Sequence, residues 1–135
     1  MKYIKKRKYP EFELQKLICS YIRMQYPNVM FLSDTIASVK LTATQAIRNK
    51  QIQNSDFKCP DLMIFEPKGK YAGLFLELKV KSPFKKNGDI YKNKHLEEQH
   101  ESLKLLREKG YKAQFVWNFD MAKFVIDEYM KLKTN

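Results

Sequence analysis

Two charged residues, Glu77 and Lys79, stand two positions apart in the apolar segment 74–80. Because side chains alternate along a β-strand, both would lie on the same face of it. The other face would be wholly apolar, with Leu74, Leu76, Leu78 and Val80. Charged groups inside a core are costly unless they are paired, so Glu77 needs a polar partner. Asp61, which follows Pro60 at the start of the preceding apolar segment, can meet Glu77 at one end of a sheet if the two strands pair.

Two carboxylates beside a lysine suit a hard divalent cation. Mg²⁺ takes oxygen ligands, usually one or two carboxylates together with waters and phosphate oxygens, and the same ligands accept Mn²⁺. Such a cation polarises a scissile phosphate and acidifies a bound water, while Lys79 would stabilise charge that develops on the phosphate. The alternative is a solvent-facing ion pair between Glu77 and Lys79 on a half-exposed strand, which would carry no chemistry.

Gln99 is another polar residue in an apolar pattern. The residues spaced three, four and three positions apart on its expected helix are Leu96, Gln99, Leu103 and Leu106. Gln99 therefore takes the place of an apolar residue on the face that we expect to be buried. A buried amide must find hydrogen-bond partners, which a site of carboxylates, lysine and water would supply. Alternatively, Gln99 lies at the edge of the apolar stripe.

The first expected helix carries two acids, Glu11 and Glu13, whose positions differ only a little. Its apolar stripe consists of Leu14, Leu17, Ile18 and Tyr21, extended by Met24. At about 100° per residue, Glu11 lies roughly 70° from the centre of this stripe and Glu13 roughly 90° away on the other side. Glu11 is therefore slightly better placed to point toward a site at the sheet. An acid in the first turn also stabilises a helix through its dipole, which is the alternative role.

Helices and strands that alternate along the chain must position these residues. Apolar spacing, caps and turn residues predict helices over 12–24, 43–53, 96–109 and a last one capped by Asp120. They predict strands over 28–32, 62–65, 74–80 and 113–117, with the middle two joined as an antiparallel hairpin. The last helix would bury Ala122, Val125, Ile126 and Tyr129. The order α, β, α, β, β, α, β, α predicts an α/β fold with a mixed central sheet flanked by helices.

Composition limits the class of protein. The chain has 135 residues, of which 44% are hydrophobic and 13% aromatic, enough for one compact core. We expect a basic arm over residues 1–10 and a single domain over residues 11–135. Cys19 and Cys59 cannot build a disulfide framework, so a reducing cytoplasm is the expected location. No apolar run approaches the ~18 residues that a membrane-spanning helix needs.

The charge points to a polyanionic partner. With 26 Lys and Arg against 15 Asp and Glu, the net charge is +11. The positive residues gather in the arm and in the segment 79–94, which contains one acid, Asp89, and such clusters are typical of nucleic-acid binding. The residues expected to hold a phosphate backbone are Lys5, Lys6, Arg7, Lys8, Lys81, Lys85, Lys86, Lys92 and Lys94. The alternative is solvated surface. Membrane binding is less favoured because neither run forms an amphipathic helix with a large apolar face.

Several strings of residues together resemble the virus-type replication-repair nuclease (VRR-NUC) family, a branch of the PD-(D/E)xK nucleases with a restriction-endonuclease-like fold. The strings are Cys59-Pro60-Asp61-Leu62, Gly73-Leu74-Phe75-Leu76-Glu77-Leu78-Lys79, then Gln99 and Gly110-Tyr111. The similarity covers nearly all of the chain from Glu11 to Tyr129, including a Glu-x-x-x-Gln pattern at Glu11 and Gln15. Relatives often have glycine just before the Pro-Asp pair, where this chain has Lys58 and Cys59, so we expect a different loop shape there.

The resemblance implies a role for each residue of the site. Asp61, Glu77 and the backbone carbonyl of Leu78 would bind the metal, and Lys79 would be the catalytic lysine. Gln99 would support the site, and Glu11 would be the acid contributed by the first helix. The resemblance further implies a Mg²⁺- or Mn²⁺-dependent DNA endonuclease of the stand-alone phage or bacterial type. Such a protein would be a homodimer that cleaves branched DNA, for example a four-way (Holliday) junction.

Two other functions stay open from the sequence. The fold could serve a DNA-binding module that does not cleave, or it could serve a sequence-specific restriction-type endonuclease. A zinc site formed by His95 and His100 is not favoured, because residues five positions apart do not face each other well on a helix.

Overall fold

A computed structural model describes residues 10–34 and 40–134. Lys5, Lys6, Arg7 and Lys8 of the predicted basic arm lie outside the described residues. The elements are α1 (Pro10–Gln25), β1 (Phe31–Ser33), α2 (Ala43–Ile52), β2 (Leu62–Ile64), β3 (Leu74–Leu78), α3 (Lys94–Glu108), β4 (Lys112–Val116) and α4 (Phe119–Met130). Their order is the predicted one. Within the described ranges, no helix is both long and apolar enough to cross a lipid bilayer.

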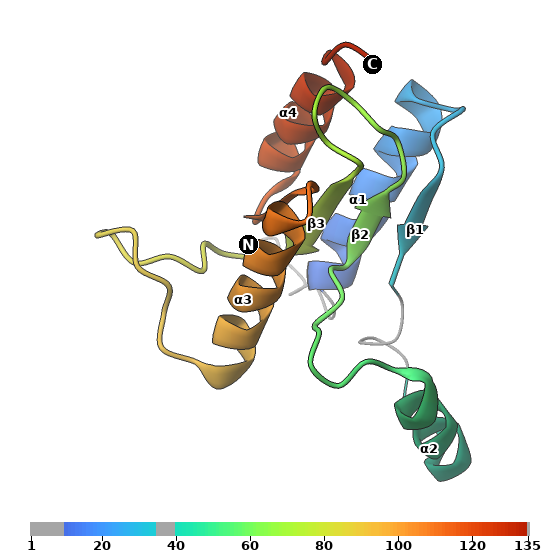
Figure 1. The fold of residues 1–135 in the computed structure, drawn as a ribbon, viewed down its shortest axis with the longest axis vertical. Coiled ribbons are helices and arrows are strands. Elements are labelled where there is room, and N and C mark those ends of the chain that lie inside the picture. The colour runs from blue at the N-terminus through green and yellow to red at the C-terminus, as the bar shows by residue number, and fades with distance from the viewer. Residues whose placement is uncertain (1–9, 35–39, 135) are drawn as a thin grey trace, which may run out of the picture.

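The four strands form one mixed sheet in the order β1-β2-β3-β4 (Figure 1). β2 and β3 pair antiparallel, with Leu62 opposite Leu76, which confirms the predicted hairpin. β4 joins β3 in parallel after the α3 crossover. Gly73, just before β3, is required by close packing, because a Cβ there would lie 2.9 Å from the carbonyl oxygen of Ile64.

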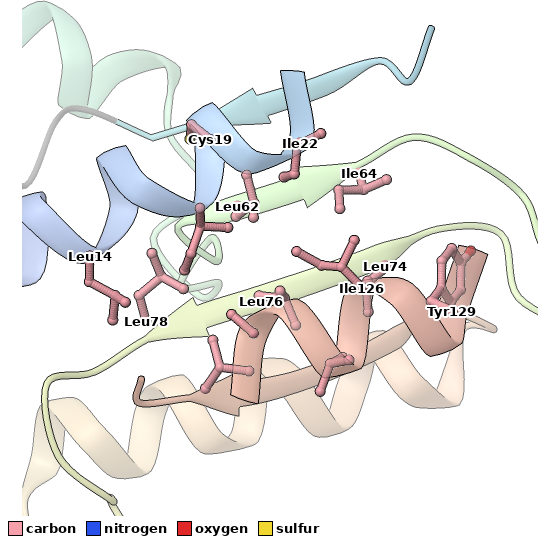
Figure 2. Close-up of a cluster of buried hydrophobic side chains, with 14 residues drawn as sticks. Leu14, Cys19, Ile22, Leu62, Ile64, Leu74, Leu76, Leu78, Ile126 and Tyr129 are labelled. Carbon is pink, nitrogen blue, oxygen red and sulfur yellow. The ribbon is translucent and has the colours of Figure 1, made fainter. Parts of the chain in front are cut away.

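One face of the sheet is covered by α1 and α4. Figure 2 shows the apolar side chains that fill this layer, including Leu14 and Ile22 of α1, Leu76 of β3 and Ile126 of α4. The side chains predicted to face inward on α4 are all buried: Ala122, Val125, Ile126 and Tyr129. This layer holds the wholly apolar face of β3.

The predicted stripe of α1 is partly wrong. The buried residues are Leu14, Ile18, Cys19 and Ile22, whereas Leu17 is 49% exposed and Met24 is 81% exposed. The sheet contacts Leu14, Ile18 and Ile22, which are spaced four residues apart. The helix has a second apolar row, so the sequence alone does not show which row is buried. Counting about 100° per residue from the buried row, Glu11 lies near its middle and Glu13 on roughly the opposite side. Relative to the observed buried row, the positions of Glu11 and Glu13 therefore differ more than they do relative to the predicted stripe.

The other face of the sheet is covered by α3. Leu103 and Leu106 pack with Phe75, Ala113 and Phe115 in a second apolar cluster. Gln99 is buried on the same face of α3, as its place in the 3–4–3 pattern predicts. Gly110 ends the helix with φ of 98°, in the left-handed region where glycine is favoured.

Three local predictions need correction. The N-cap of α4 is Asn118, whose side chain accepts a hydrogen bond from the Met121 N–H at 2.7 Å, whereas Asp120 lies in the first turn. The first strand covers Phe31–Ser33, later in the chain than the predicted 28–32. Val80 lies beyond the end of β3, which stops at Leu78, and its side chain is exposed.

α2 differs from the other helices because none of its residues is buried. A capping box begins this helix, since Thr42 and Gln45 exchange side-chain-to-backbone hydrogen bonds at 3.2 and 3.0 Å. In Figure 1 the helix projects from the body of the molecule. Local caps therefore define α2, and packing against the sheet does not.

Candidate functional site

Asp61 and Glu77 meet at one end of the hairpin formed by β2 and β3. Continuing the register from the pair Leu62–Leu76 places Asp61 opposite Glu77. Oδ2 of Asp61 accepts a hydrogen bond from the Leu78 N–H at 2.8 Å, which fastens the acid across the hairpin. The two carboxyl groups lie within hydrogen-bonding reach of each other. The structure thus brings together the two acids that the sequence predicts to converge.

The loop before Asp61 is held by α3. Pro60 is buried, and the Lys58 N–H donates a hydrogen bond to Oγ of Ser102 at 2.9 Å. No non-glycine residue in the described ranges has a positive φ, so Lys58 and Cys59 adopt ordinary backbone conformations. Glycine is therefore not needed before this Pro-Asp pair.

Glu77 is the most deeply placed acid of the site, with only 3% of its surface exposed. Nε2 of Gln99 donates a hydrogen bond to Oε1 of Glu77 at 2.8 Å. Oε1 of Gln99 is buried and has no hydrogen-bond partner among the described residues. The Gln99 side chain thus connects α3 to the site, and its buried carbonyl oxygen accepts no hydrogen bond from a described residue.

The electrostatics of the acid pair favour a bound positive charge. Burial raises the pKa of Glu77 to about 9, and the neighbouring Asp61 contributes to this rise. Burial also raises the pKa of Asp61, although the hydrogen bond from the Leu78 N–H opposes the change. A buried carboxyl group and a half-buried one this close do not both ionise readily unless a cation compensates them.

Lys79 and Glu11 complete the surroundings of the pair. The Lys79 N–H donates a hydrogen bond to the Val116 carbonyl at 2.9 Å, so its backbone continues the pairing with β4 beyond the end of the strand. The Lys79 ammonium lowers the pKa of Asp61 and Glu77 against the stronger effect of burial. Burial and Asp61 raise the pKa of Glu11. Glu11 of α1 lines the same pocket as Lys79, beside the acid pair.

Asp34 is an acid near the site that sequence reasoning missed. Its N–H donates a hydrogen bond to the Asp61 carbonyl at 2.8 Å. Nε2 of Gln15 donates to Oγ of Ser33 at 2.5 Å and to the Asp34 carbonyl at 2.9 Å, so Gln15 holds this strand end. The available signal was the position of Asp34 two residues after the apolar segment 28–32, where the strand ends.

The donor set fits Mg²⁺ or Mn²⁺ better than a metal that needs many protein ligands. Among the described residues, no three His, Cys, Asp or Glu side chains converge closely enough to hold an ion by themselves. Mg²⁺ commonly uses one or two carboxylates and keeps several waters. Asp61 and Glu77 supply two such carboxylates, and the buried oxygen of Gln99 can accept a hydrogen bond from a water.

The basic residues of the segment 81–94 lie on the surface. Its exposed lysines are Lys81, Lys85, Lys86, Lys92 and Lys94. No salt bridge between described residues involves any of these five lysines. Their charge is therefore available to a polyanion, and the segment adjoins the acid pair through Lys79.

Comparisons with known proteins agree with this architecture. No protein-family model and no curated protein matches the sequence. Among solved structures, a VRR_NUC domain protein is similar to this chain with a TM-score of 0.62 and 22% identity, covering 95% of this chain and 93% of that one. The likeness shows the fold: a mixed α/β fold of the kind found in that VRR_NUC domain protein. It extends over nearly the whole chain, as the sequence resemblance does.

Proposed function

We propose that this protein is a divalent-metal-dependent DNA endonuclease that hydrolyses phosphodiester bonds in branched DNA, such as four-way junctions. The observation that carries the proposal is the convergence of Asp61 and Glu77 across the hairpin, with Lys79 beside them. The VRR-NUC fold supports the same conclusion. Mg²⁺ or Mn²⁺ is the proposed cofactor, because such ions commonly use one or two carboxylates and Asp61 and Glu77 supply two.

Asp61, Glu77 and the carbonyl of Leu78 would hold the metal. When bound, the ion would polarise the scissile phosphate and acidify a water. The Leu78 N–H fixes the carboxylate of Asp61, and Gln99 fixes that of Glu77. Each acid is thereby held in one orientation before substrate binds, which lowers the cost of reorganisation during the reaction.

Lys79 and Glu11 have different proposed roles. Lys79 would stabilise negative charge on the phosphate in the transition state, since its ammonium lies near both acids. Glu11 would accept a proton or orient a water, because partial desolvation and the neighbouring Asp61 raise its pKa. Gln99 would act as a positioning residue through Glu77.

The proposed partner is DNA, held through its phosphate backbone by the basic arm and the lysines of the segment 81–94. We propose a single nuclease domain over residues 11–135 that acts as a homodimer, since a junction offers two related strands to cut. The proposed location is the cytoplasm of a bacterial or phage-infected cell, where Cys19 and Cys59, both free thiols, stay reduced.

The experiment that tests the proposal is incubation of the purified full chain with a labelled four-way junction, a flap and a plain duplex in Mg²⁺, in Mn²⁺ and in EDTA. We expect metal-dependent cuts near the branch, and none with Asp61→Asn. Retention of DNA without nicking under every condition would identify a non-cleaving DNA-binding module instead. Discrete fragments from plain duplex would identify a restriction-type enzyme.

A further inference from the structure

We propose that a hollow beside the acid pair holds one unpaired nucleotide of the DNA, next to the phosphate that is cut. The hollow has a volume of about 710 Å³, within the ~300–1,000 Å³ of typical ligand pockets. The inference rests on the proposed nuclease function and specifies its substrate. The DNA would have to offer an unpaired nucleotide at the point of cleavage.

Two segments and one helix form the hollow. One wall is the segment 79–84 that leaves β3, and the opposite wall is the segment 91–96 that enters α3. Glu11 of α1 also lines it, so the hollow opens beside the same groups that surround the acid pair. Lys79 belongs to both the hollow and the acid site. A nucleotide in the hollow would therefore adjoin a phosphate at the acids.

The walls are held in place by the protein itself. Phe84 and Ile90 form a bridge between the two arms of the loop, and the Tyr91 N–H donates a hydrogen bond to the Pro83 carbonyl at 3.0 Å. The Phe84 ring packs edge-on against Phe115 and Trp117, which anchors the loop to the second apolar cluster. In Figure 1 the yellow segment between β3 and α3 leaves the body on the side away from α2. The base of this loop is therefore preformed.

The lining combines positive charge with an available aromatic ring. Lys79, Lys81 and Lys92 contribute ammonium groups, and Glu11 is the one acid of the lining. Tyr91 is 50% exposed, so part of its side chain is free to contact a ligand. Sites for single-stranded nucleic acid combine cations that follow the backbone with aromatic side chains on which bases stack.

This combination favours an unpaired nucleotide over an intact duplex. A duplex keeps the faces of its bases stacked inside and presents mainly phosphates, for which lysines alone are sufficient. Tyr91 and the apolar side chains of Val80 and Leu96 would then contact nothing that matches them. A base released from the stack offers an aromatic face to Tyr91, while its phosphate meets Lys81 or Lys92.

A binding measurement tests the hollow without requiring cleavage. The cleavage-deficient Asp61→Asn chain is titrated with a flap that carries 2-aminopurine at the unpaired position next to the branch. Stacking on Tyr91 should quench the fluorescence, and Tyr91→Ala should remove the quenching and weaken binding about tenfold. Tyr91→Phe, which keeps the ring, should retain both. Phe124→Ala is the matched control, because Phe124 is a 65% exposed aromatic residue of α4 outside the hollow.

A cleavage measurement then connects the hollow to the reaction. The active chain and its Tyr91→Ala variant are compared on a flap with a normal base and on one with an abasic site at the same position. Losing either the base or the ring should slow cleavage about tenfold, and losing both should add little, because the two share one interaction. Equal slowing by Tyr91→Ala on both flaps, or unchanged quenching in this variant, would overturn the inference.

The two proposals fail in different ways. If the protein cuts no DNA in any metal but Tyr91 still quenches 2-aminopurine, the hollow binds a nucleotide and the nuclease function is wrong. If the protein cuts branched DNA and Tyr91→Ala changes neither quenching nor the ratio between the two flaps, the nuclease function stands and the hollow proposal is wrong.

Discussion

Asp127 and the pair formed by Asp61 and Glu77 are acidic groups in opposite surroundings. The carboxylate of Asp127 accepts hydrogen bonds from the hydroxyls of Tyr21 and Tyr26 and forms a salt bridge with Lys123 at 3.2 Å. Burial opposes its ionisation, but these donors outweigh burial and lower the pKa of Asp127.

The acid pair has fewer donors for more negative charge. Asp61 receives the Leu78 N–H and Glu77 receives the Gln99 amide, yet the two carboxyl groups face each other. The result is a pKa of about 9 for Glu77. The charge of Asp127 is therefore compensated within the chain, whereas the acid pair needs a proton or a cation for compensation.

Asp61→Asn should have the largest effect of the proposed substitutions. The amide would replace a proposed metal ligand, so cleavage of a four-way junction in Mg²⁺ should fall by on the order of 10³-fold. The change also removes the repulsion of Glu77, so the midpoint of thermal unfolding in EDTA should stay the same or rise. Cleavage assays and thermal unfolding on the same preparation check both parts. A large loss of stability together with unchanged turnover would show that the pair is structural.

Gln99→Leu should separate positioning from folding. The substitution removes the hydrogen bond to Glu77 and also the buried oxygen that has no partner, so the free energy of unfolding should change little. Cleavage should fall by about 10–100-fold, as is typical when a residue that orients a metal ligand is lost. Titration of Mg²⁺ should show that a higher concentration is needed for half-maximal rate. Gln99→Glu, which brings a third acid, should be worse than Gln99→Leu.

Asp127→Ala should affect stability instead of activity. It leaves the hydroxyls of Tyr21 and Tyr26 without their shared acceptor, at a cost of about 1.5–3 kcal/mol in the free energy of unfolding. Denaturant unfolding measures the loss, and cleavage per folded molecule should remain at the wild-type level. A drop in turnover larger than the drop in folded fraction would contradict the division between the two regions.

The pH dependence of stability should run in opposite directions for the two regions. The pKa of Glu77 is raised from 4.5 to about 9 in the folded chain, so its contribution is fully present below about pH 4.5 and is lost as the pH rises through 9. The pKa of Asp127 is lowered, so its contribution is present at neutral pH and is lost in acid. In EDTA, raising the pH from 5 to 9 should lower the midpoint of thermal unfolding more in the wild type than in Glu77→Gln. Parallel curves for the two proteins would rule out the raised pKa.

Much of the site followed from local patterns. Alternation along 74–80 placed Glu77 and Lys79 on one face, and the hairpin pattern brought Asp61 opposite Glu77. The 3–4–3 spacing on α3 placed Gln99 in the buried layer. These predictions succeeded because each rests on the fixed repeat of a strand or a helix, which does not depend on distant residues.

Other features had no comparable local signal. Asp34 joins the site because Gln15 of α1 holds the end of its strand. The hollow depends on how the loop packs on Phe115 and Trp117 through Phe84. Tyr21 and Tyr26 reach an acid more than a hundred positions away in the sequence, and nothing near either tyrosine points to it.

Patterns in the sequence were enough to predict the alternation of helices and strands, the faces of β3 and the burial of Gln99. Tertiary structure decided which row of α1 is buried, because Leu17 and Ile18 compete as neighbouring apolar residues and only contact with the sheet distinguishes them. It also decided the charge state of the acids. Burial and the approach of Asp61 raise the pKa of Glu77, and both exist only when the strands have paired.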